Sequence, residues 1–376
     1  MFDKQKKLIA GLLVLVLGAL AFYFLYWTKT PEYSLNLVRE AVKNHNTEQF
    51  ERHVDLDSLL NKGYDDFIAY YLKTEGKDLG GFQTLAAGAA QMMKPTLVAS
   101  LKSEVLKSIS EVKEANTPAD TGKQDKTKQQ VAVLNDNASK IYNKNVEVKG
   151  IKTDSQEPGV SIATIALHNK DLEKDFDIKL KMNKLENGQW RVKEITNLIP
   201  LLDAIKEAEL EKARKIDATV KENIYKNING YWTEAGVRQT GNWVPSYTFY
   251  MNVDLKNLTD KEIKNIKICT KMFDPNGDYV RTLMFDNIKS IAPQAQYTAR
   301  AEVKLNEFDS TDKKTISQDV RKCYFQLYVL SIETADGTKL ERPKEASTGE
   351  IYPDAGKEVK KWVDEQKKKT QNTNKE

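Results

Sequence analysis

The sequence predicts an α+β fold that begins with a membrane-spanning helix, and three observations lead to this fold class. The first is an uncharged stretch of 20 residues near the N-terminus, from Leu8 to Trp27. The second is a run of amphipathic helical patterns that gives way to alternating, strand-like patterns from Val146 onward. The third is a long series of short strands after Trp232. We therefore expect an N-terminal transmembrane helix, helices packed on a four-stranded antiparallel meander, and an all-β immunoglobulin-like sandwich.

A transmembrane helix is predicted over residues 8–27, because about twenty helical residues span the ~30 Å hydrocarbon core of a bilayer. Lysines gather before this stretch, which favours a cytoplasmic N-terminus over residues 1–7 and places the other domains outside the cytoplasm. The alternative is a cleaved signal peptide with a small-residue cleavage site at residues 19–21. The aromatic residues Tyr26 and Trp27 at its end favour a retained anchor. The expected protein is a single-pass protein of the cell membrane, with the lipid bilayer as a partner.

Composition excludes several classes of function. The net charge of +4 is spread over interleaved lysines and glutamates, so the chain lacks the basic surface that binds nucleic acid. Two cysteines and three histidines are too few and too scattered for a structural zinc site or a disulfide scaffold. The sequence contains no phosphate-binding loop, nucleophile elbow or zinc-protease motif. We therefore expect no catalytic residue, no metal and no cofactor, and hence no enzyme.

The first domain is predicted over residues 32–200. Helical spacing of apolar residues predicts helices over 35–44, 47–54, 59–72, 84–93 and 95–112. Ser34 and Thr47 are the expected N-caps of the first two helices. Residues 115–130 hold no large apolar side chain and are expected to form an exposed loop, followed by a short helix over 131–142. Four alternating strands follow, with Asn187 and Gly188 in the last hairpin. These helices are expected to cover one face of the sheet. The order of elements, helices first and then a meander of strands, is similar to that of cystatin and NTF2-like domains.

Three motifs of this domain are shared with a known family. They are a Tyr33-led helix, the segment His53-Val54-Asp55, and the Pro95-to-Val98 start of a later helix. In the chain they read TPEYSLNLVREAVKNHNTEQFERHVDLDSLL and KPTLVASLKSEVLKSIS, with GQWRVKEITNL after them. Over about residues 30–200 the chain thus resembles a bacterial family of single-pass membrane-anchored proteins of unknown function. The resemblance implies no catalytic residue.

The second half of the chain is predicted to be a helix followed by a sandwich. A connecting helix is expected over residues 201–228. Its apolar residues form an incomplete stripe along one face, and its other faces carry charges of both signs, as on a helix exposed to solvent. Alternating apolar residues over 231–345 predict about seven strands, typical of an immunoglobulin-like sandwich. The segment VDLKNLTDKEIKNIKICTKMFDPNGDYV within it resembles bacterial envelope sandwiches. The lysine-rich residues 357–376 are expected to form a flexible basic tail.

His53, Asp55 and Asp57 are the strongest candidates for a metal site, because a histidine and two carboxylates can share one ion. Side chains two residues apart lie on the same face only in a strand, however, and this segment is predicted to end a helix. We therefore expect Asp55 and Asp57 to cap the next helix instead. His45 and His168 are expected to be turn residues.

Two sets of residues in the second domain, five aromatic residues and two cysteines, each allow two interpretations. Its aromatic residues either form a binding surface or pack within the sandwich, and packing is favoured because aromatic residues are common in strands. These residues are Tyr231, Trp232, Trp243, Tyr247 and Tyr250. Side-chain parity predicts that Cys269 faces away from the core and Cys323 faces into it, so we expect no disulfide.

The favoured function is non-enzymatic: a membrane-anchored envelope protein that binds or positions an envelope protein or polymer. The alternative is a small-molecule or isomerase-like pocket in the first domain, which would need an acid or base that faces inward. The residues of the third strand expected to face inward are all apolar, and they are Phe176, Ile178, Leu180 and Met182. This pattern favours the binding function.

Overall fold

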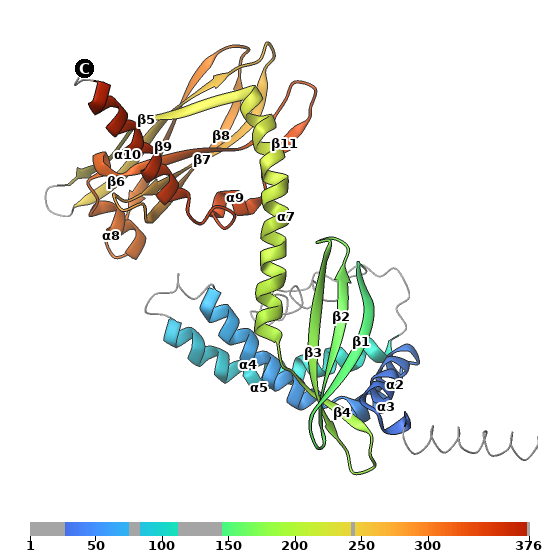
Figure 1. The fold of residues 1–376 in the computed structure, drawn as a ribbon. Helices are drawn as coiled ribbons and strands as arrows, with labels where there is room; N and C mark the ends of the chain where they lie inside the picture. The colour runs from blue at the N-terminus through green and yellow to red at the C-terminus, as the bar shows by residue number, and fades with distance from the viewer. Residues whose placement is uncertain (1–26, 75–82, 112–144, 242–244, 374–376) are drawn as a thin grey trace, which may run out of the picture. The chain divides into compact units, whose positions relative to one another are not determined.

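The computed structural model describes residues 27–74, 83–111, 145–241 and 245–373 (Figure 1). The chain divides into two compact units, residues 1–208 and 209–376, and the division falls within the long helix α7 (Leu198–Asn227). This helix covers most of the range over which a helix is predicted, residues 201–228. Both units contain helices and antiparallel sheets, so the structure is α+β.

The predicted fold class is wrong in its first element. None of the helices in the described ranges is both long enough and apolar enough to cross a membrane. The four longest described helices, α4, α5, α7 and α10, all carry charged side chains within their length. The stretch predicted to span the bilayer falls almost wholly on residues 1–26, outside the described residues, and Trp27 opens a short 3-10 helix, η1 (Trp27–Lys29). The helices in the described ranges therefore give no support to the predicted transmembrane anchor, the single-pass topology, the cell-membrane localisation or the bilayer as a partner.

Unit 1 begins with a group of helices. They are α2 (Pro31–Lys43), α3 (Thr47–His53), α4 (Leu56–Thr74) and α5 (Gln83–Ser110). Thr30 and not Ser34 caps α2, because Pro31 is well suited to the first helical position and lets the helix start earlier. Asn46 and not Thr47 caps α3. The two predicted helices over 84–112 are one continuous helix with Pro95 inside it. Tyr64, Leu97 and Val98 pack around this proline turn and offset its lost hydrogen bond.

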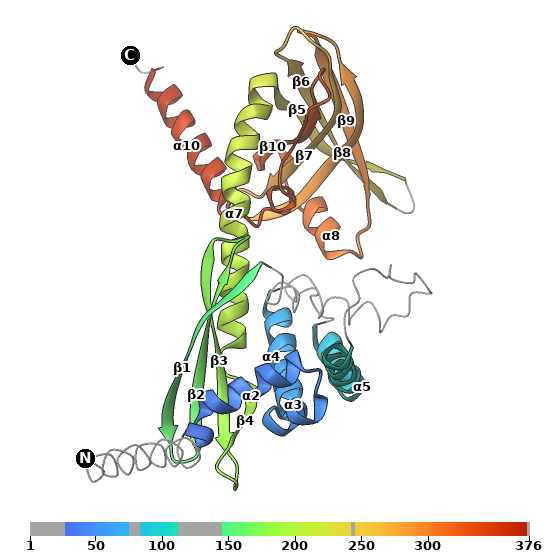
Figure 2. The same ribbon diagram turned by 90° about the vertical axis from the view of Figure 1, so that its right-hand side faces the viewer.

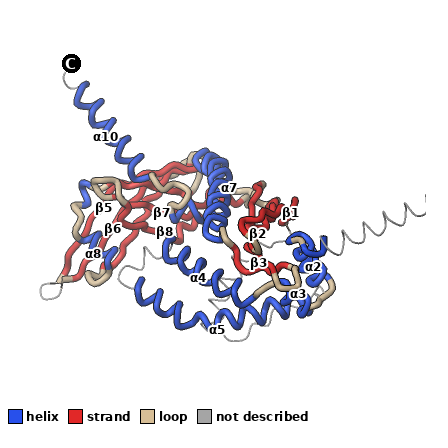
Figure 3. The backbone as a smooth tube through the Cα atoms, turned by 60° about the horizontal axis from the view of Figure 1, so that its bottom comes forward, coloured by secondary structure: helices blue, strands red, loops and turns tan. Residues whose placement is uncertain are grey.

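The sheet of unit 1 has four antiparallel strands in the order β1-β2-β3-β4. They are β1 (Val146–Glu157), β2 (Val160–Asn169), β3 (Lys174–Lys184) and β4 (Trp190–Ile195). Gly188 in the last hairpin has a φ of 86°, the left-handed conformation that favours glycine in a tight turn. Met182, Trp190 and Val192 of the sheet pack against Leu35 and Leu56 of the helices. Figure 3 shows these helices gathered beside the strands. The loop predicted over 115–130 and the helix over 131–142 lie outside the described residues.

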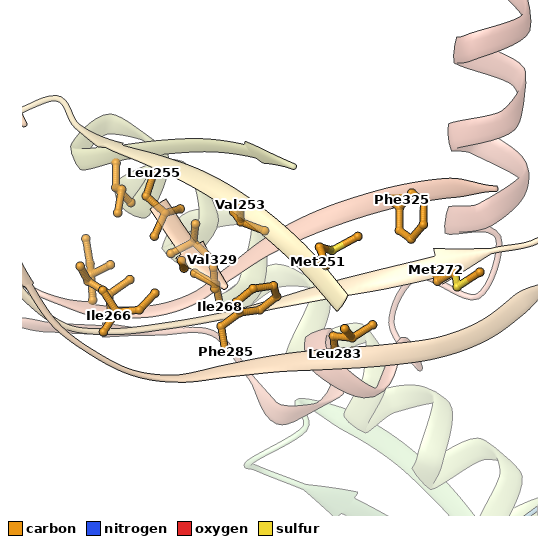
Figure 4. Close-up of a cluster of buried hydrophobic side chains, with 14 of the residues drawn as sticks. Met251, Val253, Leu255, Ile266, Ile268, Met272, Leu283, Phe285, Phe325 and Val329 are labelled. Atoms are coloured by element: carbon orange, nitrogen blue, oxygen red, sulfur yellow. The ribbon is translucent and has the colours of Figure 1, made fainter. Parts of the chain in front are cut away.

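Unit 2 contains two antiparallel sheets around one core. The strands are β5 (Ile228–Thr240), β6 (Ser246–Asn257), β7 (Ile263–Phe273), β8 (Tyr279–Ile291), β9 (Gln296–Leu305), β10 (Tyr324–Glu333) and β11 (Lys339–Glu341). Their orders are β5-β6-β9 in one sheet and β11-β10-β7-β8 in the other. Met251 and Val253 of β6 face Ile268 and Val329 of the other sheet across the core (Figure 4). Alternation along β6 sets this arrangement, because every second side chain must leave water.

Helices cover the other face of the four-stranded sheet. Lys271 and Tyr328 point away from the core and are nevertheless buried. The second half of α7 and the short helix α9 (Lys344–Thr348) lie over them: the Lys271 ammonium donates to the Ala346 carbonyl oxygen (3.2 Å), and the Tyr225 hydroxyl of α7 donates to the Leu327 carbonyl oxygen (3.5 Å). Two further short helices, α8 (Ser310–Ile316) and η3 (Val320–Lys322), lie between β9 and β10.

The predicted flexible tail over residues 357–376 is wrong for most of its length. Helix α10 (Ala355–Thr373) occupies it, as Figure 2 shows near the C-terminus. Gly356 fits tightly against Phe273 of β7, since an added Cβ would lie 2.4 Å from that ring. An ion pair between Lys360 and Asp364, at 2.8 Å and one turn apart, further supports the helix.

Both cysteines are free and buried. Cys323 belongs to the core between the two sheets, whereas Cys269 pairs in register with Tyr328 on the face that the helices cover. The parity prediction is thus confirmed: the two thiols lie on opposite faces of the four-stranded sheet. Burial raises the pKa of each thiol to about 11, so both are protonated and unreactive at neutral pH.

Candidate binding surface

The structure gives His53, Asp55 and Asp57 separate partners and does not bring them together as ligands. His53 is 2% exposed, and its Nδ1 donates to the Trp190 carbonyl oxygen at 3.3 Å. Burial lowers the pKa of His53, so the ring is neutral. Asp57 lies in the first turn of α4, where it pairs with Lys102 at 2.9 Å. Across the described ranges no group of three or more histidine, cysteine or acidic side chains is placed to hold a metal.

Asp55 is the N-cap of α4, as the sequence predicts. Its carboxylate accepts from the Ser58 backbone N–H at 3.1 Å and is also bound by the Lys193 ammonium. Burial by itself raises the pKa of Asp55, but the hydrogen bonds from Lys193 and Ser58 lower it to about 2 overall. Asp57, in contrast, does not cap a helix; its partner is a lysine of α5.

Stability at acid pH should depend on Asp55. A carboxylate whose folded pKa is below its unfolded value stabilises the fold above the unfolded pKa, and this stabilisation is lost as the pH falls through the folded pKa. We expect Asp55→Asn to cost about 2 kcal/mol of unfolding free energy at pH 6. The difference from the unmodified chain should shrink below about pH 4 and vanish near pH 2. Urea unfolding at several pH values measures it, and a pH-independent difference would contradict this assignment.

His45 and His168 also have local structural roles. His45 has a φ of 56° in the turn after α2, and its Nδ1 donates to the Ile109 carbonyl oxygen at 2.8 Å. The His168 ring lies 2.6 Å from a carboxylate oxygen of Asp175, across the β2–β3 pair. His45 thus lies in a turn, as predicted, whereas His168 belongs to strand β2 and pairs with a single carboxylate.

A cleft of about 660 Å³ lies between α4 and α5 in unit 1, on the helices and not inside the sheet. Its charged side chains are already paired: Lys94 with Asp65 at 2.8 Å, and Lys102 with Asp57 at 2.9 Å. The rest of its lining is largely apolar, including Val98. It therefore lacks the buried, unpaired carboxylate that an isomerase-like site would need.

The aromatic candidates of the second domain separate into two groups. Tyr247 packs against the core, so packing is confirmed for it. The Trp232 ring lies 4.9 Å from that of Phe325 but Trp232 is 41% exposed, so it packs only in part. Tyr231 is 58% exposed, and Tyr250 projects from the outer face of β6, between the buried Phe249 and Met251. For Tyr231 and Tyr250 the prediction that they pack within the sandwich is wrong. The fifth candidate, at position 243, lies outside the described residues.

The outer face of the β5-β6-β9 sheet places charged side chains of both signs around Tyr250. Register brings Gly236 of β5 and Glu302 of β9 directly opposite Tyr250. The guanidinium groups of Arg238 and Arg300 lie 5.2 Å and 5.8 Å from the centre of the tyrosine ring. These distances are within the range of cation–π attraction, so the two arginines hold the ring from two sides.

Hydrogen bonds and ion pairs connect the same side chains. The Asn252 amide and the Tyr250 hydroxyl both donate to the Glu234 carboxylate, at 3.0 Å and 3.4 Å. Arg300 donates to Glu302 at 2.6 Å. We call this set the Tyr250 surface, and its members are Glu234, Arg238, Tyr250, Asn252, Arg300 and Glu302. Because its members already contact one another, little side-chain freedom remains to be lost on binding.

Gly236 makes room for this arrangement. A Cβ at this position would lie 2.7 Å from the Tyr250 hydroxyl oxygen, closer than side chains approach. The absence of a side chain therefore lets the tyrosine lie over β5. Tyr250 could be singled out from the sequence, but both arginines and both glutamates could not, because they come from two other strands, β5 and β9. Strand parity could have found them only together with the pairing register.

No family of known sequences matches the chain, and no curated protein matches it. One solved structure, described as "X-ray structure of Northeast Structural Genomics Consortium target SoR45", matches over 30% of this chain and 74% of its own. The sequence identity is 14% and the TM-score is 0.18, and so low a score carries no argument about fold or function.

Proposed function

We propose that this protein is a non-enzymatic binding protein and that the Tyr250 surface contacts a protein partner. The observation that carries the proposal is the position of the Tyr250 ring, which lies between two guanidinium groups on an outward sheet face. Tyrosine and arginine are the residues on which binding energy concentrates at protein interfaces. A face built from both, and already ordered, is suited to a folded partner.

The charges of the surface favour a protein over a nucleic acid or a simple anion. Two arginines are accompanied by two glutamates, Glu234 and Glu302, so the surface has no net charge of one sign. A nucleic acid or a phosphate would be repelled by the carboxylates. A protein surface offers groups of both charges together with apolar area, and it complements this pattern.

Site-directed photo-crosslinking in cells tests the proposal. A photoreactive residue at Lys304, exposed on β9 beside the Tyr250 surface, should give one dominant cross-linked protein. The matched control places the same residue at Lys289, which is exposed on β8 of the other sheet. We expect the product only from position 304. Equal labelling from both positions, or no product from position 304, would contradict the proposal.

A further inference from the structure

Strand β5 is an edge of its sheet, and among the residues that the structure describes part of that edge has no backbone partner. In the sheet order β5-β6-β9, β5 pairs only with β6. Within the described residues, the backbone hydrogen bonds of residues 234–238 run to β6 alone. A bulge between Trp232 and Glu234 ends the regular edge on one side. This stretch is Glu-Ala-Gly-Val-Arg, with one charged residue at each end and no proline, so its charges admit only a strand that offers the opposite charge at each position.

The five residues of this stretch are self-complementary. In two antiparallel strands related by a twofold axis at Gly236, Glu234 of one copy lies directly opposite Arg238 of the other. Side chains at residues 234, 236 and 238 share the outer face of the sheet, since they pair with Asn252, Tyr250 and Thr248 of β6. Directly opposite side chains in such a pair are about 5 Å apart, which is close enough for an ion pair. The other face matches as well, because Ala235 lies opposite Val237.

From this complementarity we infer that the partner of β5 is a second copy of this chain. Residues 234–238 of the two copies pair antiparallel about Gly236 and join the two three-stranded sheets into one continuous sheet of six strands. Two Glu234–Arg238 ion pairs form across the junction. In the single chain the Arg238 side chain is half exposed, and its ion-pair partner, Glu302, is 3.9 Å away, so Arg238 can accept a closer carboxylate. Glu234 keeps its hydrogen bonds from Asn252 and Tyr250 and contacts the arginine of the other copy in addition. The inference does not depend on the partner proposed for the Tyr250 surface.

Charge reversal tests the pairing. Glu234→Arg leaves arginines at both positions, and Arg238→Glu leaves glutamates at both, so each variant opposes like charges when it pairs with itself. We expect each variant to dimerise at least about 30-fold more weakly than the unmodified chain. An equimolar mixture of the two variants should dimerise again, because every arginine then lies opposite a glutamate. Sedimentation velocity of the full chain over a concentration series measures all four samples.

The recovery in the mixture separates pairing from misfolding, since a misfolded variant would not regain a partner. Lys256→Glu, on the same sheet face but on β6 away from the edge, is the matched control and should dimerise normally. Three results would each overturn the inference: a monomeric unmodified chain at every concentration, a mixture that stays monomeric, or a control that weakens as much as the two variants.

Discussion

Arg342→Ala is expected to lower the free energy of unfolding by about 3–5 kcal/mol. The Arg342 guanidinium donates twice to the Asp217 carboxylate, from Nε and Nη2, each at 2.7 Å. Both side chains are fully buried, at 0% exposed. Without the arginine, the buried carboxylate would keep one hydrogen bond, from the Tyr352 hydroxyl at 2.6 Å, and the longer-range attraction of Lys221. An uncompensated buried charge is one of the most destabilising changes a protein can undergo.

A double variant separates the effect of losing the ion pair from the effect of leaving one buried charge without its partner. Asp217→Leu combined with Arg342→Met replaces both charges with apolar groups of similar size, which is often close to neutral. We therefore expect the double variant to recover most of the stability that Arg342→Ala loses. Urea unfolding of the full chain measures all three proteins. A loss below about 1 kcal/mol for the single variant would show that the pair is hydrated and not buried.

Phe249→Ala is expected to lower the free energy of unfolding by about 3–5 kcal/mol, because it removes a large side chain from the centre of the sandwich core. Phe249 is 0% exposed and packs among the apolar residues of both sheets. Phe249→Leu keeps most of the volume and should cost about 1.5 kcal/mol or less. Urea unfolding measures both variants. A similar loss for alanine and leucine would contradict the packing described for β6.

The two faces of β6 were predictable from the sequence. Phe249, Met251 and Val253 alternate with polar residues, and all three are fully buried. What surrounds Tyr250 was not predictable, because Arg238 and Arg300 belong to other strands and alternation alone contains no pairing register. The same limit applies to Asp217 and Arg342, which meet across a separation of 125 residues. Local patterns identify which side of an element is apolar and do not identify which elements meet.

The helices were predicted less well than the strands, for local reasons. The sequence predicts that Pro95 begins a new helix, but packing within unit 1 keeps α5 continuous through it. Helix α10 was missed because charged residues dominate its sequence, and its contact with Phe273 depends on Gly356, which adds no apolar signal. The transmembrane prediction rests on the length and hydropathy of residues 8–27, the lysines before them and the aromatic residues at their end. It finds no counterpart in the helices that the structure describes.

The central claim is that the Tyr250 surface binds a protein partner, and Tyr250→Ala tests it most directly. The measurement is the yield of the product cross-linked from position 304 in the full chain. Tyr279→Ala is the matched control, since Tyr279 is 53% exposed on the other sheet. We expect Tyr250→Ala to reduce the yield at least about tenfold. Because it removes two cation–π contacts, it should lower the free energy of unfolding by about 1–2 kcal/mol, which leaves the chain folded. An unchanged yield for Tyr250→Ala, or an equal loss for Tyr279→Ala, would contradict the claim.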